Sequence, residues 1–169
     1  MTATGFETHD HSACISTALA AAETCCTEHR LQFTKVRRRV LEILLHEHRA
    51  LGAYDILAVL AGEGLGAQPP VAYRALEFLV SNGFAHKIEK LNAYIACSLP
   101  GQDHSPVFMI CRSCQTVVEA QTVLPAGQLA QVARDAGFDI ERAVIEAEGT
   151  CPACRNSKDA ASDAPGTKA

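Results

Sequence analysis

The chain of 169 residues contains no tryptophan, and aromatic residues make up only 5% of it. No stretch approaches the ~20 apolar residues that a membrane-spanning helix requires. The segment from Met1 to Ala22 lacks the basic start, uninterrupted apolar run and cleavage site of a secretory signal. These absences predict a cytoplasmic protein without a membrane partner, whose cysteines stay reduced.

The net charge is −4 and the isoelectric point is near 5.9, which argues against a protein that coats nucleic acid by charge alone. Hydrophobic residues make up 48% of the chain, which excludes a mainly disordered protein and allows one medium domain or two small ones. Basic residues are nevertheless concentrated in one segment. This concentration indicates either a phosphate-binding patch or a solvated helix face. They are Arg30, Lys35, Arg37, Arg38 and Arg39.

Cysteine, in contrast, is abundant. Eight cysteines are present, and four of them form two Cys-x-x-Cys pairs, Cys111/Cys114 and Cys151/Cys154. Two thiolate pairs on separate tight turns are what a closed tetrahedral zinc site needs. The alternative is two redox dithiols or buried cysteines, but the pair is doubled and no Trp-Cys-x-x-Cys context is present. The sequence therefore predicts a structural zinc ion at these four cysteines.

Helical patterns fill the first half of the chain. An Ala-rich segment at 14–29 favours a helix, and a second helix follows Thr34, a good N-cap. Glycines end a third helix at 53–61, and a Pro-Pro pair begins a fourth that stops at Asn82-Gly83. Strands are expected at 84–89 and 93–97. Three short helices before a hairpin predict a winged helix-turn-helix, in which the helix at about 71–81 is free to enter a DNA major groove.

The second half of the chain has the pattern of a smaller unit. Residues 98–106 are polar and contain two prolines and a glycine, which is typical of a hinge. Beyond it we expect strands at 107–111, 116–120 and 142–147, with a helix at 126–136. We predict an α+β protein with a helical N-terminal extension (1–30), a winged-helix domain (31–97), a hinge (98–106), a zinc-stapled α/β domain (107–155) and a disordered tail (156–169).

A second set of metal-ligand types is spread over both halves. His86, Cys97, His104 and Glu119 offer two imidazoles, one thiolate and one carboxylate, which suits tetrahedral zinc. They belong to the wing, its end, the hinge and the second domain, so they meet only if the two domains fold toward each other. Each also has an ordinary role as a strand, core, loop or surface residue. Spacing alone leaves their joint ligation open.

Taken together, these motifs resemble the ferric uptake regulator superfamily, and within it the zinc-sensing branch. The likeness covers about residues 31–154. It rests on motifs that recur together: Ala53-Tyr54-Asp55, Tyr73-Arg74-Ala75-Leu76, Leu91-Asn92-Ala93-Tyr94 and both cysteine pairs.

The resemblance implies a homodimer that uses its second domain for dimerisation, binds double-stranded DNA at an inverted-repeat operator and represses zinc-uptake genes when zinc is bound. It implies at least two zinc ions per subunit, one structural at the four cysteines and one regulatory at His86, Cys97, His104 and Glu119. It also implies DNA contacts by Tyr54 and Arg74, with Tyr73, Arg37 and Lys35 toward phosphates. The alternative is a regulator of this family that senses another ion or peroxide.

Three features depart from the family pattern. Val71-Ala72 stands where the family usually has Thr-Val, which removes a hydroxyl that could cap the helix or contact a phosphate. The His-rich run of the iron and peroxide sensors is reduced to His104, which favours zinc over iron. Five residues match no motif of the family, and we interpret them as part of an extension, with accessory metal binding as the alternative. They are His9, His11, Cys14, Cys25 and Cys26.

An enzyme and a redox switch are the competing interpretations. Zinc deaminases require a proline directly before a cysteine pair, and neither pair here follows one. His46-Glu47-His48 is too short for the His-Glu-x-x-His helix of a metalloprotease. No nucleophile and base pair emerges, so we predict no catalytic residues and no small-molecule substrate. A switch in which oxidised cysteine pairs release zinc stays open.

Overall fold

The structure is a computed structural model that describes residues 12–46, 49–100, 104–120, 126–141 and 143–156. The expectations for His9 and His11, for Glu47-His48, for hinge residues 101–103 and for the tail at 157–169 lie outside the described residues, as does the side chain of Cys14. In the described part of the chain, no helix has the length and apolar character needed to cross a membrane.

Four helices make up the N-terminal half: α1 (Ser12–Glu28), α2 (Lys35–His46), α3 (Ala53–Gly62) and α4 (Pro69–Ser81). Thr34 caps α2, because its hydroxyl accepts a hydrogen bond from the Arg37 amide at 3.4 Å. Proline is tolerated in the first turn of α4, where its missing N–H would have had no helical partner. Gly83 follows the end of α4 at a φ of 72°, a conformation that favours glycine. These signals place all four helices close to their predicted bounds.

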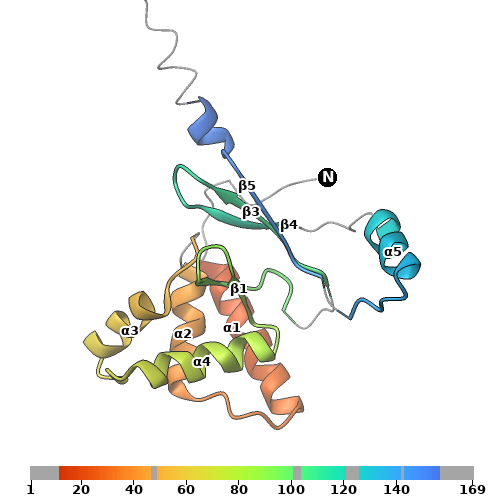
Figure 1. The fold of residues 1–169 in the computed structure, drawn as a ribbon. Coiled ribbons are helices and arrows are strands. Elements are labelled where there is room, and N and C mark those ends of the chain that lie inside the picture. Colours follow the sequence, from red (N-terminus) through yellow and green to blue (C-terminus); the bar gives the residue numbers. More distant parts are fainter. Residues whose placement is uncertain (1–11, 47–48, 101–103, 121–125, 142, 157–169) are drawn as a thin grey trace, which may run out of the picture.

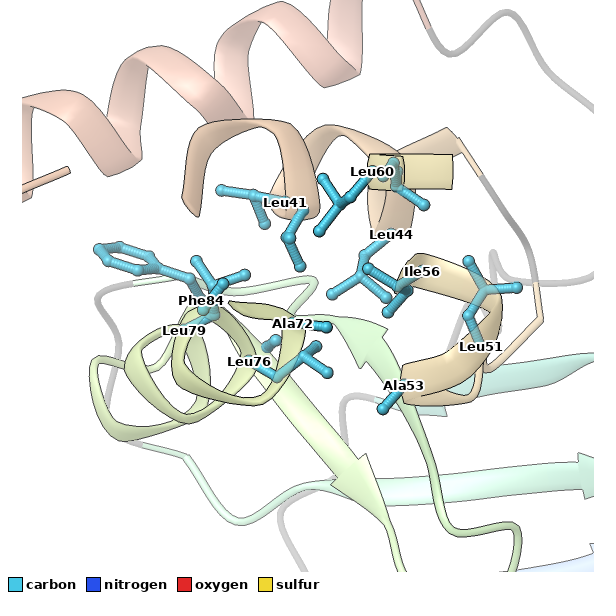
Figure 2. Close-up of a cluster of buried hydrophobic side chains, with 14 of the residues drawn as sticks. Leu41, Leu44, Leu51, Ala53, Ile56, Leu60, Ala72, Leu76, Leu79 and Phe84 are labelled. Atoms are coloured by element: carbon cyan, nitrogen blue, oxygen red, sulfur yellow. The ribbon is translucent and has the colours of Figure 1, made fainter. Parts of the chain in front are cut away.

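One apolar core holds the four helices together (Figure 2). It contains buried side chains from α2, α3 and α4, including Leu41, Leu44, Ile56, Leu60, Leu76 and Leu79. Helix α1 joins the same core through Ile15, Leu19, Ala22 and Cys26. The segment predicted as an N-terminal extension therefore packs against α2.

A hairpin follows the helices. Strands β1 (Ala85–Ile88) and β2 (Ala93–Ala96) pair antiparallel, from Ala85 opposite Ala96 to Ile88 opposite Ala93. The turn between them includes Asn92 at a φ of 47°, a left-handed conformation that asparagine tolerates better than most residues. Leu51, just before α3, bridges to Tyr94 of β2. Helices α2–α4 and this hairpin form the predicted winged helix-turn-helix.

The C-terminal half contains a three-stranded sheet in the order β4-β3-β5. The elements of this half are β3 (Val107–Cys111), β4 (Val117–Ala120), α5 (Ala126–Asp135) and β5 (Ile145–Gly149). The predicted strand at 142–147 is wrong by about three residues at its start, because parallel pairing with β3, from Val107 opposite Ile145 to Cys111 opposite Gly149, sets the limits of β5. Figure 1 shows the sheet beside the hairpin, with α5 on the side away from α1–α4.

The two halves contact each other through the hairpin. Ile88 and Ile95 of the hairpin pack with Phe108, Ile110 and Val117 of the sheet in a second apolar cluster. A bridge between Arg49 and Thr116 adds a backbone link next to it. The hairpin is therefore both the wing of the winged-helix domain and the contact surface between the two halves.

Candidate metal centres and DNA-binding surface

The four-cysteine cluster lies at one end of the three-stranded sheet. Cys111 ends β3, Cys114 lies in the turn before β4, and Cys151 and Cys154 follow β5. Pairing of Cys111 with Gly149 carries the end of β5 to the β3–β4 turn. Cys114 Sγ lies 3.7 Å from Cys151 Sγ, and the four sulfurs lie within 4.8 Å of one another. The structure thus brings together the four cysteines that were assigned to one site.

Backbone amides and neighbouring sulfurs set the charge state of this cluster. The Cys151 amide donates to Cys111 Sγ at 3.3 Å. The backbone N–H groups of Cys114 and Cys151 lower the pKa of Cys111 to about 6. Hydrogen bonds of its thiol to the sulfurs of Cys151 and Cys114 raise the pKa of Cys154 to about 12. A hydrogen bond with the Thr116 hydroxyl also lowers the pKa of Cys114. The thiolates of Cys111 and Cys114 are thus favoured and that of Cys154 is not, so four thiolates require a cation, and this sulfur set fits Zn²⁺.

The mixed cluster, which comprises His86, Cys97, His104 and Glu119, lies where the hairpin meets the sheet. His104 Nε2 is 2.7 Å from Glu119 Oε1 and 3.7 Å from Cys97 Sγ. His86 Nε2 is 3.2 Å from the same Glu119 oxygen. One ligand atom from each residue lies within 4.8 Å of the others. Residues from β1, the end of β2, the following segment and β4 therefore converge, as their assignment to one site requires.

Two backbone amides orient the ligand atoms of the mixed cluster. Glu119 Oε2 accepts a hydrogen bond from the Ser98 amide at 2.8 Å, which leaves Oε1 facing the two imidazoles. Cys97 Sγ accepts one from the Leu99 amide at 3.3 Å. Such outer contacts fix the direction of metal ligands. The sequence did not reveal them, because backbone donors carry no residue signature.

His86 shows that the mixed cluster is incomplete with protein groups alone. Its side chain is buried, and Nε2 has no hydrogen-bond partner of acceptable geometry among the described residues, although Glu119 Oε1 is near. A buried nitrogen without a partner is costly. Tetrahedral zinc with bonds of its usual length places ligand atoms about 3.3–3.8 Å apart. The separations of 3.2 and 3.7 Å are close to that spacing, whereas His104 Nε2 and Glu119 Oε1, 2.7 Å apart, must move slightly apart to hold an ion. The four residues are of the types that bind zinc and lie close enough together to fit it.

The charge state of the mixed cluster differs between its two anionic ligands. Burial raises the pKa of Cys97 to about 12, and the nearby Glu119 charge adds to this shift. Burial alone would also raise the pKa of Glu119, but the approach of His86 and the hydrogen bond from Ser98 outweigh it and lower the pKa to about 2. The carboxylate is therefore charged at neutral pH, whereas the thiol ionises only beside a cation.

Cys25 and Cys26 stand apart from both clusters. Cys26 is buried in the helical core. Cys25 is half-buried, and its Sγ lies 3.6 Å from Nδ1 of His29. In the part of the chain that the structure describes, three or more metal-ligand residues come together only at the two clusters. An accessory site that uses His9 or His11 concerns residues outside that part.

Four of the five predicted DNA contacts lie on the surface of the helical half. Tyr54, at the start of α3, and Tyr73, in α4, are 68% and 44% exposed, and Arg74 and Lys35 are also exposed. Arg37 is different, because its guanidinium lies over the ring of Phe78 at 3.8 Å and donates to the Gln32 carbonyl. Arg37 therefore links α2 to α4 as well as adding positive charge.

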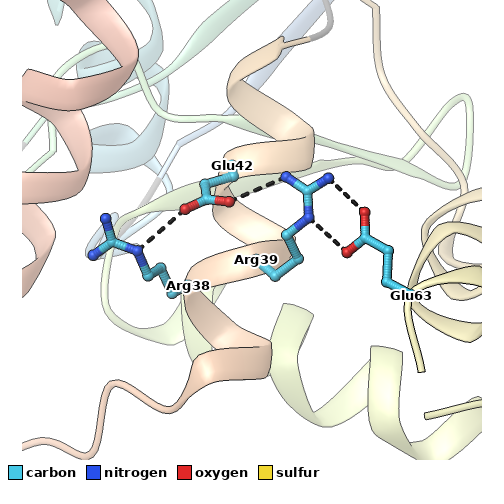
Figure 3. A network of polar contacts seen from close by, with 4 residues as sticks. All are labelled: Arg38, Arg39, Glu42 and Glu63. Atoms are coloured by element: carbon cyan, nitrogen blue, oxygen red, sulfur yellow. Dashed lines mark hydrogen bonds and ion pairs between the residues drawn. The ribbon is translucent and has the colours of Figure 1, made fainter. Parts of the chain in front are cut away.

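The neighbouring arginines have acidic partners, as Figure 3 shows. Arg39 donates to both carboxylate oxygens of Glu63 at 2.8 and 2.6 Å. Arg38 and Arg39 each contact Glu42 at 3.1 Å. Arg38 also pairs with Glu23 of α1. These two arginines brace α1, α2 and α3, so the basic patch is smaller than the sequence pattern suggested.

Similarity to known proteins extends over most of the chain. No family model matches it. The chain is 37% identical over 137 residues to the zinc uptake regulation protein of Escherichia coli strain K12, an alignment that covers 80% of each protein. The chain belongs to the zinc uptake regulators of the Fur family. The family resemblance stated from the motifs is thereby confirmed.

Solved structures agree with this assignment. A zinc uptake regulator complexed with zinc and DNA superimposes with a TM-score of 0.81 at 35% identity, over 86% of this chain and 97% of that one. Holo XcZur gives a TM-score of 0.74 at 34% identity, over 83% of this chain and 98% of that one. The predicted α+β fold class of this zinc uptake regulator is confirmed.

Proposed function

We propose that this zinc uptake regulator is a DNA-binding repressor of zinc-uptake genes whose affinity for DNA responds to zinc at the mixed cluster. The position of that cluster carries the proposal. His86 and Cys97 belong to the winged-helix hairpin, whereas Glu119 belongs to the C-terminal sheet. The likeness to a zinc uptake regulator complexed with zinc and DNA supports both ligands for this chain.

The ligand set couples metal binding to the relative position of the two halves. Bound zinc would supply a divalent charge shared by one thiolate, one carboxylate and two imidazoles. Because these residues come from both halves, their convergence fixes the hairpin and the preceding helix α4 against the sheet. DNA that prefers this arrangement then binds more tightly whenever the arrangement is stabilised. Complete switching requires roughly a 10⁴-fold preference for one arrangement, about 5.5 kcal/mol.

We assign the four-cysteine cluster a structural role, which makes two zinc ions per subunit. All four of its residues come from β3, the turn after it and the segment after β5. Closing such a site ties the end of the sheet together without involving the helical half. A small sheet with one helix gains its stability from such a staple. The regulatory and structural sites would therefore act independently.

An exposed apolar surface supports a homodimer. Leu129, Val132 and Phe138, on α5 and just after it, are 50%, 65% and 65% exposed. Large apolar side chains gathered on one surface mark an interaction site. A second copy of the chain on this surface would present two α4 helices, so we expect an inverted-repeat operator with half-sites about one turn of DNA apart.

We assign DNA contacts to the exposed polar groups of α3, α4 and α2. Arg74 on α4 can pair with guanine O6 and N7, which reads sequence. We expect Tyr54 to contact bases or backbone with Arg74, and Tyr73 and Lys35 to contact phosphates, with Arg37 adding charge from its position over Phe78. The relatives are regulators rather than enzymes, which supports a non-enzymatic role. We assign the protein to the reducing cytoplasm, where its thiols stay available to metal.

The proposal is tested by a gel shift on the DNA upstream of the gene at buffered free zinc, together with the native mass of the protein with and without chelator. We expect a dimer with two zinc ions per subunit at high zinc, and loss of DNA binding with loss of one of them. A parallel series in mild peroxide tests the redox alternative. Binding that follows peroxide and ignores free zinc would contradict the proposal.

A further inference from the structure

Three residues form a row across the C-terminal sheet. Phe108 of β3 pairs with Glu119 of β4 on one side and with Glu146 of β5 on the other. Residues directly opposite each other on neighbouring strands point their side chains to the same face. Phe108 is buried in the apolar cluster that includes Ile88 and Ile95 of the hairpin. The row Glu119–Phe108–Glu146 therefore lies on the face that the hairpin covers.

The two carboxylates of this row hold opposite ends of the hairpin. Glu119 receives the Ser98 amide, just after β2, and faces His86. Glu146 receives two consecutive amides of the β1–β2 turn: its Oε1 accepts from Glu89 N at 2.7 Å and its Oε2 from Lys90 N at 2.9 Å. From Glu119 to Glu146 the row crosses two strand spacings, about 9.6 Å. From His86 to Glu89 the hairpin advances three residues, about 10 Å. The two carboxylates are therefore about as far apart as the two parts of the hairpin that they contact.

The contact made by Glu146 involves no metal ligand. Each carboxylate oxygen accepts one N–H group, an arrangement stronger than a bond between neutral groups. The side chains nearby are balanced in charge, since Lys87 pairs with Glu89 at 2.7 Å and Lys90 lies 3.6 Å from Glu148. Glu146 thus adds an anchor for the turn at the end of the hairpin opposite the mixed cluster.

We propose that Glu146 is a positioning residue for the zinc response, a metal-independent anchor that holds the hairpin so that His86 and Cys97 face Glu119 and His104. This inference rests on the proposed function, because it concerns how the mixed cluster is assembled. With the turn anchored, a larger fraction of molecules has the four ligands converged before metal arrives. The apparent affinity for zinc is proportional to that fraction, so it falls by the same factor when the fraction falls.

The test compares Glu146→Gln with Glu148→Gln in the full-length protein. Glutamine keeps the size of the side chain but presents one amide donor to an N–H group, so one of the two contacts is lost. Glu148 lies on the same strand, and its carboxylate lies 3.6 Å from the side-chain nitrogen of Lys90, an exposed pair of little energetic weight. Three quantities are measured: the zinc affinity of the mixed cluster, the zinc content of the four-cysteine cluster, and the amide exchange rates of Glu89 and Lys90 with the mixed cluster free of zinc.

We expect Glu146→Gln to weaken zinc binding at the mixed cluster roughly tenfold and to speed exchange at the two amides by a similar factor, while the four-cysteine cluster keeps its zinc. Glu148→Gln should change each quantity less than about twofold. Unchanged zinc affinity or unchanged exchange in Glu146→Gln would overturn the anchor, and so would an equal effect of the two variants. A wild-type protein whose DNA binding ignores zinc would instead refute the proposed function, and the exchange rates would still test the anchor.

Discussion

The four-cysteine cluster takes all its members from the C-terminal sheet and its turns, whereas the mixed cluster takes His86 and Cys97 from the hairpin and Glu119 from the sheet. In the first, closing the site only ties together elements that the β3–β5 pairing already holds side by side. In the second, closing the site fixes one half of the molecule against the other. If the proposed function holds, similar metal-binding chemistry supplies stability at the four-cysteine cluster and a conformational signal at the mixed cluster.

The two clusters also differ in which ligand is charged before metal binds. In the four-cysteine cluster, Cys111 is favoured as a thiolate by backbone amides, so a first ligand is charged at neutral pH. In the mixed cluster, the charged ligand is Glu119, and the Cys97 thiol ionises only with a cation beside it. Zinc binding must displace a proton from Cys97 in the mixed cluster and from Cys154 in the four-cysteine cluster, so the apparent affinity of both sites depends on pH.

The largest effect is expected from Cys151→Ser, which removes one sulfur from the four-cysteine cluster. A structural zinc site contributes folding free energy directly, so the sheet should unfold and the dimer should dissociate. We expect the thermal midpoint to fall by at least about 10 °C. Zinc content, native mass and calorimetry measure this. A stable dimer that lacks only one zinc ion would show that the cluster is not a staple.

Glu119→Gln should break the mixed cluster and leave the staple intact. Glutamine can still accept the Ser98 hydrogen bond, so the fold and one zinc ion per subunit should be kept. The effect of zinc on DNA affinity, which complete switching would make roughly 10⁴-fold, should fall below about tenfold. Gel shifts at buffered zinc measure it, with Glu148→Gln as the control. A full zinc response in Glu119→Gln would assign the sensor to other residues.

The sequence predicts the two clusters with unequal ease, for a physical reason. A Cys-x-x-Cys pair places two sulfurs on one turn, so each half of the four-cysteine site is visible locally. The mixed cluster has no two ligands on one turn, and spacing alone left it open until the family resemblance implied it. Glu146 was missed altogether, because its contact with Glu89 and Lys90 depends on the register of β5.

The same distinction separates what was predicted of the fold from what was not. Helix caps such as Thr34 and stop signals such as Gly83 act within a few residues, and they gave the helices correctly. The limits of β5 depend on its partner β3, and local alternation misplaced its start. Arg39 belonged to a basic segment that the sequence left open as a phosphate-binding patch or a solvated helix face, and its guanidinium is bound by Glu63, just after α3. Partners distant in sequence are what local patterns cannot show.

Arg74→Ala should leave both clusters unchanged and weaken DNA binding alone. The side chain is exposed on α4, and Arg74 is a member of neither cluster. Loss of a bidentate contact to guanine should reduce affinity for the operator about tenfold to hundredfold, with two zinc ions per subunit retained. Affinity is measured on operator and random DNA of equal length. A loss of equal size on both would assign Arg74 to phosphate contact rather than sequence reading.

Cys25→Ser should have the smallest effect. It tests whether zinc binding is confined to the two clusters or also involves a cysteine outside them. Cys25 is half-buried and its Sγ lies 3.6 Å from Nδ1 of His29, and among the described residues it belongs to no group of three or more metal-ligand side chains. Two such groups do not complete a tetrahedral site. We therefore expect unchanged zinc content and zinc response, and a free energy of unfolding within about 0.5 kcal/mol of the original. Loss of a zinc ion in Cys25→Ser would reveal a third centre, completed by residues that precede α1.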